Sequence, residues 1–289
     1  MFLVLSGIEY DDPSLAFATG VDTVRALPGK VSLTVLRQGK LTAEKDPDAR
    51  LAVGSAFKLA VLAALNDQIA AGKHSWDEVI RLRDEWKSLP TGVLQNWPTG
   101  SRLTIETLAT QMISISDNTA TDALIDIVGR EAIQAYLPGN DPLLNTRQLF
   151  MLKSPRLAPL LQRWRQADVA GRRALLQEID AQPHEWLTGE GYVTTANDVE
   201  WFVSTRELCN LISKVAQIDV FRVNSGGADE GEWRSVAFKG GSEPGVVNLT
   251  YEVTAADGSK SCVSATWNDT SADADTLLQP VQQIIRGLK

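Results

Sequence analysis

The chain has 289 residues, of which 44% are hydrophobic and 22% are charged, and it contains 21 glycines and 12 prolines. This composition is that of an ordinary globular protein, and it excludes a disordered or collagen-like chain. The formal net charge of −8 opposes broad contact with phosphate backbones or anionic lipid, so we expect no nucleic acid partner.

The first regular stretch is an alternation of apolar and polar residues over Lys30–Arg37, which predicts a strand. Residues 38–40 supply a turn, and residues 41–43 are expected to return beside the strand as a hairpin. The next segment, residues 55–71, is rich in Ala and Leu, begins at Ser55 and ends before Gly72. This pattern is typical of a largely buried helix.

Apolar residues recur at helical spacing through the middle of the chain. Helices are predicted over residues 103–113, 119–128, 131–137 and 157–167. Beyond Arg234 the pattern returns to period two. It predicts strands over residues 235–239, 246–254 and 261–267, followed by an amphipathic helix over residues 272–288.

Strands at both ends of the chain with helices between them predict an α/β (α+β) fold. We expect an antiparallel sheet from both chain termini, flanked by helices, with an inserted all-helical subdomain. Residues 1–54 plus 202–289 would form the sheet-containing subdomain and residues 55–201 the mainly helical one. The two parts together would make a single discontinuous domain.

Histidine and cysteine are the scarcest residues that carry chemistry, with two of each in the chain. A structural zinc site needs four such ligands, and neither their number nor their spacing suggests one, so no metal and no cofactor is expected. His74 and His184 stand in contexts typical of surface or capping positions, so a nucleophilic enzyme of this sequence would use another base. Cys209 and Cys262 could pair or stay free, and two thiols do not assign a redox compartment.

The start of the chain carries no clear targeting signal. Residues 1–5 are apolar, but the acidic Glu9, Asp11 and Asp12 follow, and no basic segment precedes them. No uncharged apolar stretch is long enough for a transmembrane helix, so no membrane partner is expected. We expect a cytoplasmic location if Met1 is the native start, and a periplasmic or secreted one if a leader was removed.

Three short motifs carry the candidate chemistry, and the first is Ser55-Ala-Phe-Lys58 at the start of a predicted helix. A spacing of three puts both side chains on one helix face. A serine hydroxyl becomes a nucleophile when a base takes its proton, and a desolvated lysine has a pKa low enough to serve. Taken alone, a helix cap beside an unrelated lysine explains such a match better.

The second motif is Ser116-Asp117-Asn118, and the third runs from Phe238 to Ser242 as Phe-Lys-Gly-Gly-Ser on a predicted strand. Ser, Asp and Asn are common helix caps, and glycines on strands are common at bulges and tight turns. Each motif taken alone can therefore be explained by a structural role, without a catalytic function. The combination of the three motifs in this order is a more specific indication of a catalytic function than any one of them.

Together, the three motifs resemble the Ser-x-x-Lys, Ser-Asp-Asn and Lys-Thr-Gly set of class A β-lactamases and penicillin-binding proteins. The interval from Ser55 to Ser116, 116 − 55 = 61 residues, is similar to the class A interval. Residues 107–129 and 192–198 also resemble family segments, and the likeness runs from about Lys30 to the C-terminus. The resemblance implies a β-lactamase/transpeptidase-like fold and a class A β-lactamase-like serine hydrolase.

The resemblance also implies a role for each motif residue. Ser55 would attack a carbonyl and be acylated, with Lys58 as base or proton relay. Ser116 would pass a proton to the leaving group, helped by the charge of Lys239.

The substrate-binding residues implied by the resemblance are Asn118, Gly241 and Ser242. Asn118 would hold the substrate amide, while the neighbouring Asp117 is expected to be structural. The backbone amides of Ser55 and Ser242 would form the oxyanion hole, beside Gly241.

The sequence departs from the family pattern at three places. Gly240 makes the third motif Lys-Gly-Gly, which removes a hydroxyl that helps bind the β-lactam carboxylate. The glutamate that activates the deacylating water in class A enzymes is not identifiable, although Asp141, in an Asp-Pro-Leu-Leu-Asn segment, is a candidate. No arginine occurs between Val246 and Trp267, where some family members bind the carboxylate.

The leading hypothesis is a serine hydrolase that forms an acyl-enzyme through Ser55 and acts on a small-molecule β-lactam or related amide or ester. An esterase or D,D-peptidase of the same fold is the alternative, and a non-catalytic ligand-binding relative is the alternative of another class. A pure binding module has no need of a nucleophile together with its base, which argues against the last. The sequence does not give the oligomeric state.

Overall fold

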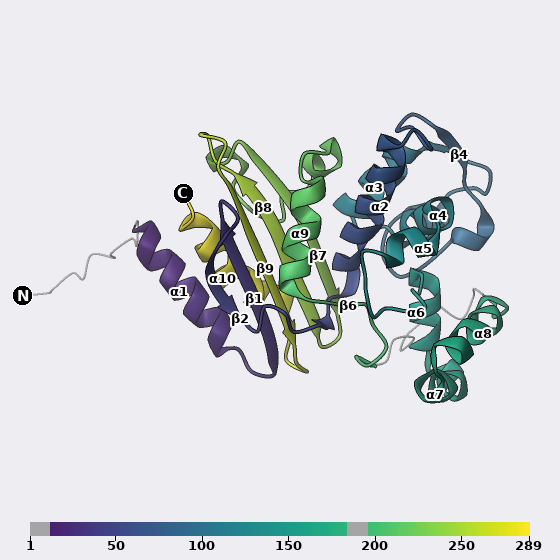
Figure 1. The fold of residues 1–289 in the computed structure, drawn as a ribbon. Helices are drawn as coiled ribbons and strands as arrows, with labels where there is room; N and C mark the ends of the chain where they lie inside the picture. Colours follow the sequence, from purple (N-terminus) through teal and green to yellow (C-terminus); the bar gives the residue numbers. More distant parts are fainter. Residues whose placement is uncertain (1–11, 184–195) are drawn as a thin grey trace, which may run out of the picture.

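The computed structural model describes residues 12–183 and 196–289. Its central element is a five-stranded antiparallel sheet in the order β2-β1-β9-β8-β7 (Figure 1). Its strands are β1 (Lys30–Arg37), β2 (Lys40–Lys45), β7 (Ser235–Glu243), β8 (Val246–Thr254) and β9 (Lys260–Asn268). The amino-terminal hairpin pairs with the last strand, from Lys30 opposite Asn268 to Arg37 opposite Ser261, so the sheet from both termini is confirmed.

The described residues outside this sheet contain the α-helices. They are α1 (Pro13–Ala26), α2 (Lys58–Ala70), α3 (Ile105–Ser114), α4 (Asn118–Val128), α5 (Arg130–Gln134), α6 (Thr146–Leu152), α7 (Ala158–Gln166), α8 (Val169–Asp180), α9 (Thr205–Val215) and α10 (Ala274–Arg286). Two small ribbons pair β3 (Leu51–Ala52) with β6 (Phe202–Val203), and β4 (Val79–Arg81) with β5 (Arg102–Thr104). Within residues 12–183 and 196–289, no helix combines the length and apolarity needed to cross a membrane.

One face of the sheet is covered by α1 and α10, which lie together at one end of the molecule (Figure 1). Val24 of α1 and Ile284 of α10 are fully buried with Leu33 and Tyr251 of the sheet. The two helices approach closely because Gly20 has no side chain: a Cβ there would lie 2.5 Å from Pro280 O.

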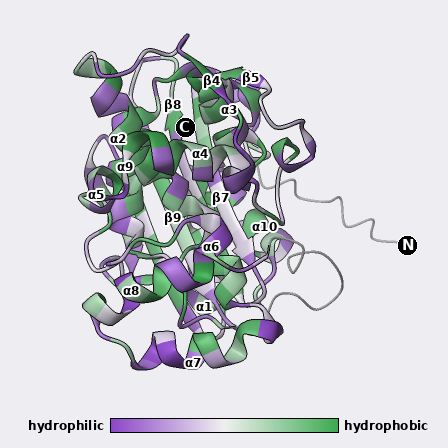
Figure 2. Ribbon diagram, turned by 90° about the vertical axis from the view of Figure 1, so that its right-hand side faces the viewer, coloured by the Kyte–Doolittle hydropathy of each residue, from purple (hydrophilic) through white to green (hydrophobic). Residues whose placement is uncertain are grey.

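The opposite face packs on α9 and the larger helical part, whose core centres on α2. Every residue from Lys58 to Leu65 is buried, so α2 has no solvent-facing side in this stretch. Figure 2 shows hydrophobic residues along α2, whereas hydrophilic residues recur along α7 at the edge of the molecule. Because α2 lies in the core, the amine of its first residue, Lys58, is removed from water.

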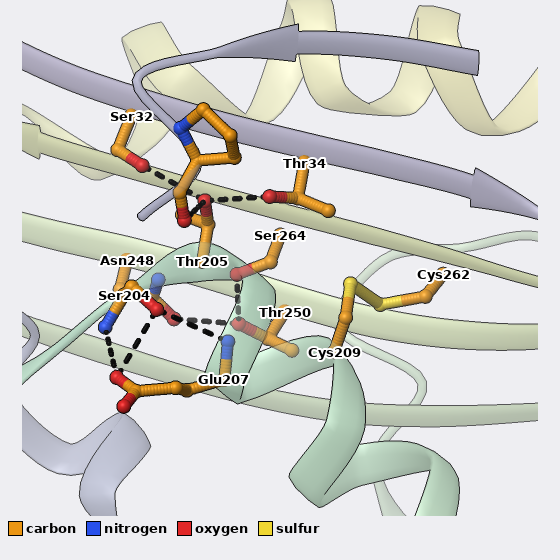
Figure 3. Close-up of a disulfide and its surroundings, with 11 residues drawn as sticks. Ser32, Thr34, Ser204, Thr205, Glu207, Cys209, Asn248, Thr250, Cys262 and Ser264 are labelled. Atoms are coloured by element: carbon orange, nitrogen blue, oxygen red, sulfur yellow. Dashed lines mark hydrogen bonds between the residues drawn. A yellow bond between two sulfur atoms is a disulfide. The ribbon is translucent and has the colours of Figure 1, made fainter. Parts of the chain in front are cut away.

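A disulfide joins α9 to the sheet, which answers the question left open by the two cysteines. Cys209 is bonded to Cys262 of β9, and both residues are buried (Figure 3). At the start of α9, the Thr205 hydroxyl is hydrogen-bonded at 2.8 Å to the hydroxyls of Ser32 and Thr34 on β1 (Figure 3). Covalent and polar contacts therefore fix α9 against the sheet.

The structure corrects several expected boundaries. Among the described residues the first regular element is α1, not the strand at Lys30, and α9 lies in a stretch for which no helix was expected. Ser55 lies in a 3₁₀ turn, Gly54–Phe57, and the α-helix begins only at Lys58. Strand β7 continues to Glu243 because its glycines pair with β8. The division into residues 1–54 plus 202–289 and residues 55–201 stays a prediction.

Candidate active site

The turn that carries Ser55 packs directly against strand β7. A Cβ at Gly241 would lie 2.1 Å from Val53 O and 2.7 Å from Ser55 N, so no side chain fits between the strand and the turn. From the other side, Gly54 adopts a φ of +49°, and a Cβ there would lie 3.4 Å from Ser242 N. The backbone amides of Ser55 and Ser242 are thus carried by two segments in direct contact.

Lys58 lies at the centre of the site, with no exposed surface. Its Nζ donates hydrogen bonds to Ser116 O at 2.8 Å, Ser116 Oγ at 3.0 Å and Asn118 Oδ1 at 2.7 Å. The structure therefore brings the first two motifs together. Ser55, half-buried, precedes Lys58 by three residues, a spacing that places both on one side of the turn.

The pKa of Lys58 lies well below its ordinary value of 10.5. Burial is the largest cause, and the charge of Lys239 lowers it further, while Asp122, Asp117 and Glu243 act in the opposite direction. An amine without its extra proton keeps a lone pair. Lys58 can therefore accept a proton from a neighbouring hydroxyl.

Lys239 of β7 brings the third motif to the same hydroxyl. Its Nζ donates to Ser116 Oγ at 3.1 Å and to Gly240 O at 2.5 Å. Only 3% of the residue is exposed, and burial lowers its pKa from 10.5 to about 7. The hydroxyl of Ser116 thus lies between two amines, each of which is easier to deprotonate than a lysine in water.

The turn at Ser116 is held in a left-handed conformation, with a φ of +58°. Thr91 Oγ1 donates to Ser116 O at 2.6 Å. Asp117 caps α4 by accepting from Ala120 N at 2.8 Å, and it also accepts from Val93 N at 2.7 Å. These hydrogen bonds hold Ser116 in a backbone conformation that is unfavourable for a residue other than glycine. They also give Asp117 a structural role.

Asn118 orients Lys58. Its Oδ1 accepts from Lys58, and its Nδ2 donates to Leu89 O at 2.9 Å. Both ends of the side-chain amide are engaged by the protein, and the residue is 2% exposed. This geometry supports a role in holding the amine more directly than a role in holding a substrate.

The structure does not bring Asp141 to the motif residues. Its carboxylate is bound by Arg173 through two hydrogen bonds of 2.9 Å and one of 3.3 Å. The residue lines a surface pocket with Trp164, Arg172 and other residues, none of them from the three motifs. The carboxylate of Asp141, the candidate deacylating base, is thus bound by an exposed arginine.

A buried ionic cluster that no sequence motif predicts lies beside the site and is formed by Lys153, Glu200 and Glu243. Lys153 begins a cation-rich segment, residues 153–173, yet its side chain is 1% exposed. Its Nζ donates to Glu200 Oε1 and to Glu243 Oε2. A signal was present for Glu243, because it follows Lys239 and Gly241 at strand periodicity and so shares their face.

Glu200 is the most buried of the three. Its pKa lies well above 4.5, because burial opposes its charge and the nearby Glu243 adds to the effect.

His184 and part of the family-like segment 192–198 lie outside the described residues.

The family model described as "Beta-lactamase enzyme family" matches residues 21–216, more than half of the chain. The chain belongs to this family. None of the curated proteins matches it.

Solved structures share the fold at low identity. The β-lactamase from Sphaerobacter thermophilus DSM 20745 is 22% identical over 94% of each chain, with a TM-score of 0.64. PBP-A is 18% identical over 94% of each chain, with a TM-score of 0.63. An ancestral class A β-lactamase, GNCA, is 17% identical over 94% of this chain and 98% of its own, with a TM-score of 0.62. The expected β-lactamase-like fold is confirmed, and family and fold support a β-lactamase-like hydrolase.

Proposed function

We propose that the protein is a serine hydrolase that forms an acyl-enzyme through Ser55. The observation that carries this proposal is the buried amine of Lys58, hydrogen-bonded to Ser116 and Asn118 and lowered in pKa. A structural lysine would be expected to pair with a carboxylate in such a place. Within residues 12–183 and 196–289, the hydrogen-bond partners of the amine are a backbone carbonyl, a hydroxyl and a side-chain amide.

Acylation begins when neutral Lys58 accepts the proton of the Ser55 hydroxyl as its oxygen bonds to the substrate's carbonyl carbon. The carbonyl oxygen takes the electron pair and is stabilised by the amides of Ser55 and Ser242. The C=O bond then re-forms as the bond from this carbon to the leaving group breaks. Ser116 donates its proton to the leaving group and recovers one from Lys58 along their 3.0 Å hydrogen bond. The amine is neutral again, and water later cleaves the acyl-serine ester to give the acid and free Ser55.

The substrate proposed is a small β-lactam or a related amide or ester. PBP-A, which shares the fold, has been described in a variant as an acyl-enzyme complex with penicillin G. For the present chain, the absence of a side chain at Gly240 favours an ester as a second candidate. A Cβ there would lie 2.9 Å from Phe238 Cζ, so the ring fills space next to the position of the family's hydroxyl.

Incubation with a fluorescent penicillin and, separately, with an activated ester, followed by intact-mass measurement, tests the proposal. We expect one acyl group on the protein and none on Ser55→Ala. Ser14→Ala, at an exposed position in the first turn of α1, is the matched control and should acylate normally.

A lasting penicilloyl adduct would favour a penicillin-binding protein. Rapid ester turnover without β-lactam hydrolysis would favour the esterase. Failure of both reagents to acylate or turn over would contradict the proposed enzyme and leave the non-catalytic ligand-binding relative.

A further inference from the structure

The cluster of Lys153, Glu200 and Glu243 joins three parts of the chain that are distant in sequence. Lys153 directly follows α6, Glu200 precedes β6, and Glu243 is the last residue of β7. The side chains are 1%, 0% and 7% exposed, so the three ionisable groups interact almost without solvent. Removing one member of such a cluster leaves a buried charge uncompensated.

Glu200 belongs to the segment that supports the Ser55 turn. The next residue, Trp201, accepts a hydrogen bond from Val53 N at 3.1 Å through its backbone oxygen. Its ring stacks on Phe57, with centroids 3.8 Å apart and an angle of 10° between the planes. Val53 and Phe57 lie on either side of Ser55, so Trp201 contacts the turn both before and after the nucleophile.

Glu243 belongs to the segment that carries the second amide. It directly follows Ser242 and lies on the same strand face as Gly241, which contacts Ser55 N. Strand β7 is at the edge of the sheet and has β8 as its one neighbour there. An edge strand has ladder hydrogen bonds on one side alone, so its end needs another restraint to stay fixed.

We propose that Lys153 is a positioning residue that, through Glu200 and Glu243, fixes the separation of the two oxyanion-hole amides, those of Ser55 and Ser242. One carboxylate is attached to each supporting segment, and a single ammonium holds both. A stabilising role alone would be served as well or better by apolar side chains of similar size. The inference rests on the proposed acyl transfer at Ser55.

The test is infrared difference spectroscopy of the acyl-enzyme formed with an activated ester whose carbonyl carbon is ¹³C. Hydrogen bonds from the two amides weaken the C=O bond and lower its stretching frequency. In Lys153→Met, which removes the charge and keeps the length, we expect a higher frequency and acylation about tenfold slower, less than the loss of a whole donor. Lys214→Met is the matched control, because Lys214 pairs with Asp67 at 2.9 Å in an exposed position.

A second variant, Glu243→Gln, keeps the shape of the side chain and an oxygen to accept from Lys153, so it tests the proposal even if Lys153→Met does not fold. It should raise the frequency in the same direction. Variants that melt at lower temperature but show the parent frequency and acylation rate would overturn the positioning role and leave the proposed function standing. If the parent protein forms no acyl-enzyme, the proposed function fails, and the inference that rests on it fails as well.

Discussion

Lys239→Met is expected to make the protein more stable and unable to transfer acyl groups. The ammonium of Lys239 is buried, and burial lowers its pKa from 10.5 to about 7. At pH 7 the unfolded chain therefore holds this proton firmly, whereas the folded chain holds it on about half of the molecules. Methionine has a similar length and carries no charge to bury.

The size of the effect follows from the two pKa values. A difference of about 3.5 between unfolded and folded chains opposes folding by about 4 kcal/mol at pH 7. The variant also loses the hydrogen bonds from Lys239 to Ser116 and to Gly240 O. At about 1 kcal/mol each, these leave a net stabilisation of about 2 kcal/mol.

The difference between variant and parent should also depend on pH. A lowered lysine pKa opposes folding most at pH values below the folded pKa, about 7. Between that value and 10.5 the unfolded chain binds more protons than the folded one, so the stability of the parent rises with pH. The advantage of the variant should therefore shrink by about 1.4 kcal/mol per pH unit.

Urea denaturation at several values between about pH 7 and about pH 10 measures this difference. Lys40→Met, at the exposed first residue of β2, is the control and should show no such trend. A variant that is less stable than the parent at every pH, or a difference that does not change with pH, would refute the reasoning.

Three further predictions concern other parts of the site and fold. Acylation by the parent should slow in acid, because Lys58 is then protonated. It should also slow above about pH 7, because Lys239 loses the charge that assists Ser116. Stopped-flow measurements of the acylation rate check this, and a rate that does not change with pH would contradict these roles. Gly241→Ala should abolish acylation and lower stability, because its Cβ would lie 2.1 Å from Val53 O. Thermal melting and the ester assay check this, with Gly231→Ala as the control, because Gly231 is exposed and a Cβ there meets the Asp229 side chain at 3.2 Å. Replacing both Cys209 and Cys262 by alanine should lower the free energy of unfolding by about 4 kcal/mol, because the disulfide closes a loop between cysteines 53 residues apart and so restricts the unfolded chain. An unchanged midpoint of urea denaturation would show that the bond is not formed.

Much of the sheet could be predicted because its strands alternate in hydrophobicity. The predicted bounds of β1 and β8 agree with the structure, since each carries its own pattern. The extension of β7 to Glu243 could not be predicted in the same way. Gly240 and Gly241 give no apolar pattern, and their strand conformation comes from pairing with Leu249 and Asn248.

The two helices that were not predicted, α1 and α9, differ in how clearly their sequences indicate a helix. The helix α9 has a capping box, Ser204 with Glu207, followed by an amphipathic pattern that identifies it. By contrast, α1 buries three residues and is stabilised by α10, which is far away in sequence. Its formation depends on a tertiary contact that no local pattern describes.

Residues of the candidate site could be predicted where they belong to a short sequence motif. They could not be predicted where tertiary contacts bring them to the site. Lys58 and Ser116 follow from short motifs, and the structure brings them together. The burial of Lys153 has no local signature, because a lysine in a cation-rich segment is usually solvated. Asp141 illustrates the reverse: a family-like segment whose carboxylate is bound by a distant arginine.

Mapping the acylated residue tests the central claim most directly. Trypsin cleaves after Arg50 and Lys58, which releases residues 51–58, and Ser55 is the one hydroxyl residue in this peptide. After treatment with an activated ester, tandem mass spectrometry should find the acyl group on this peptide, and on none in Ser55→Ala. Label on another residue, or turnover that persists in Ser55→Ala, would contradict the account.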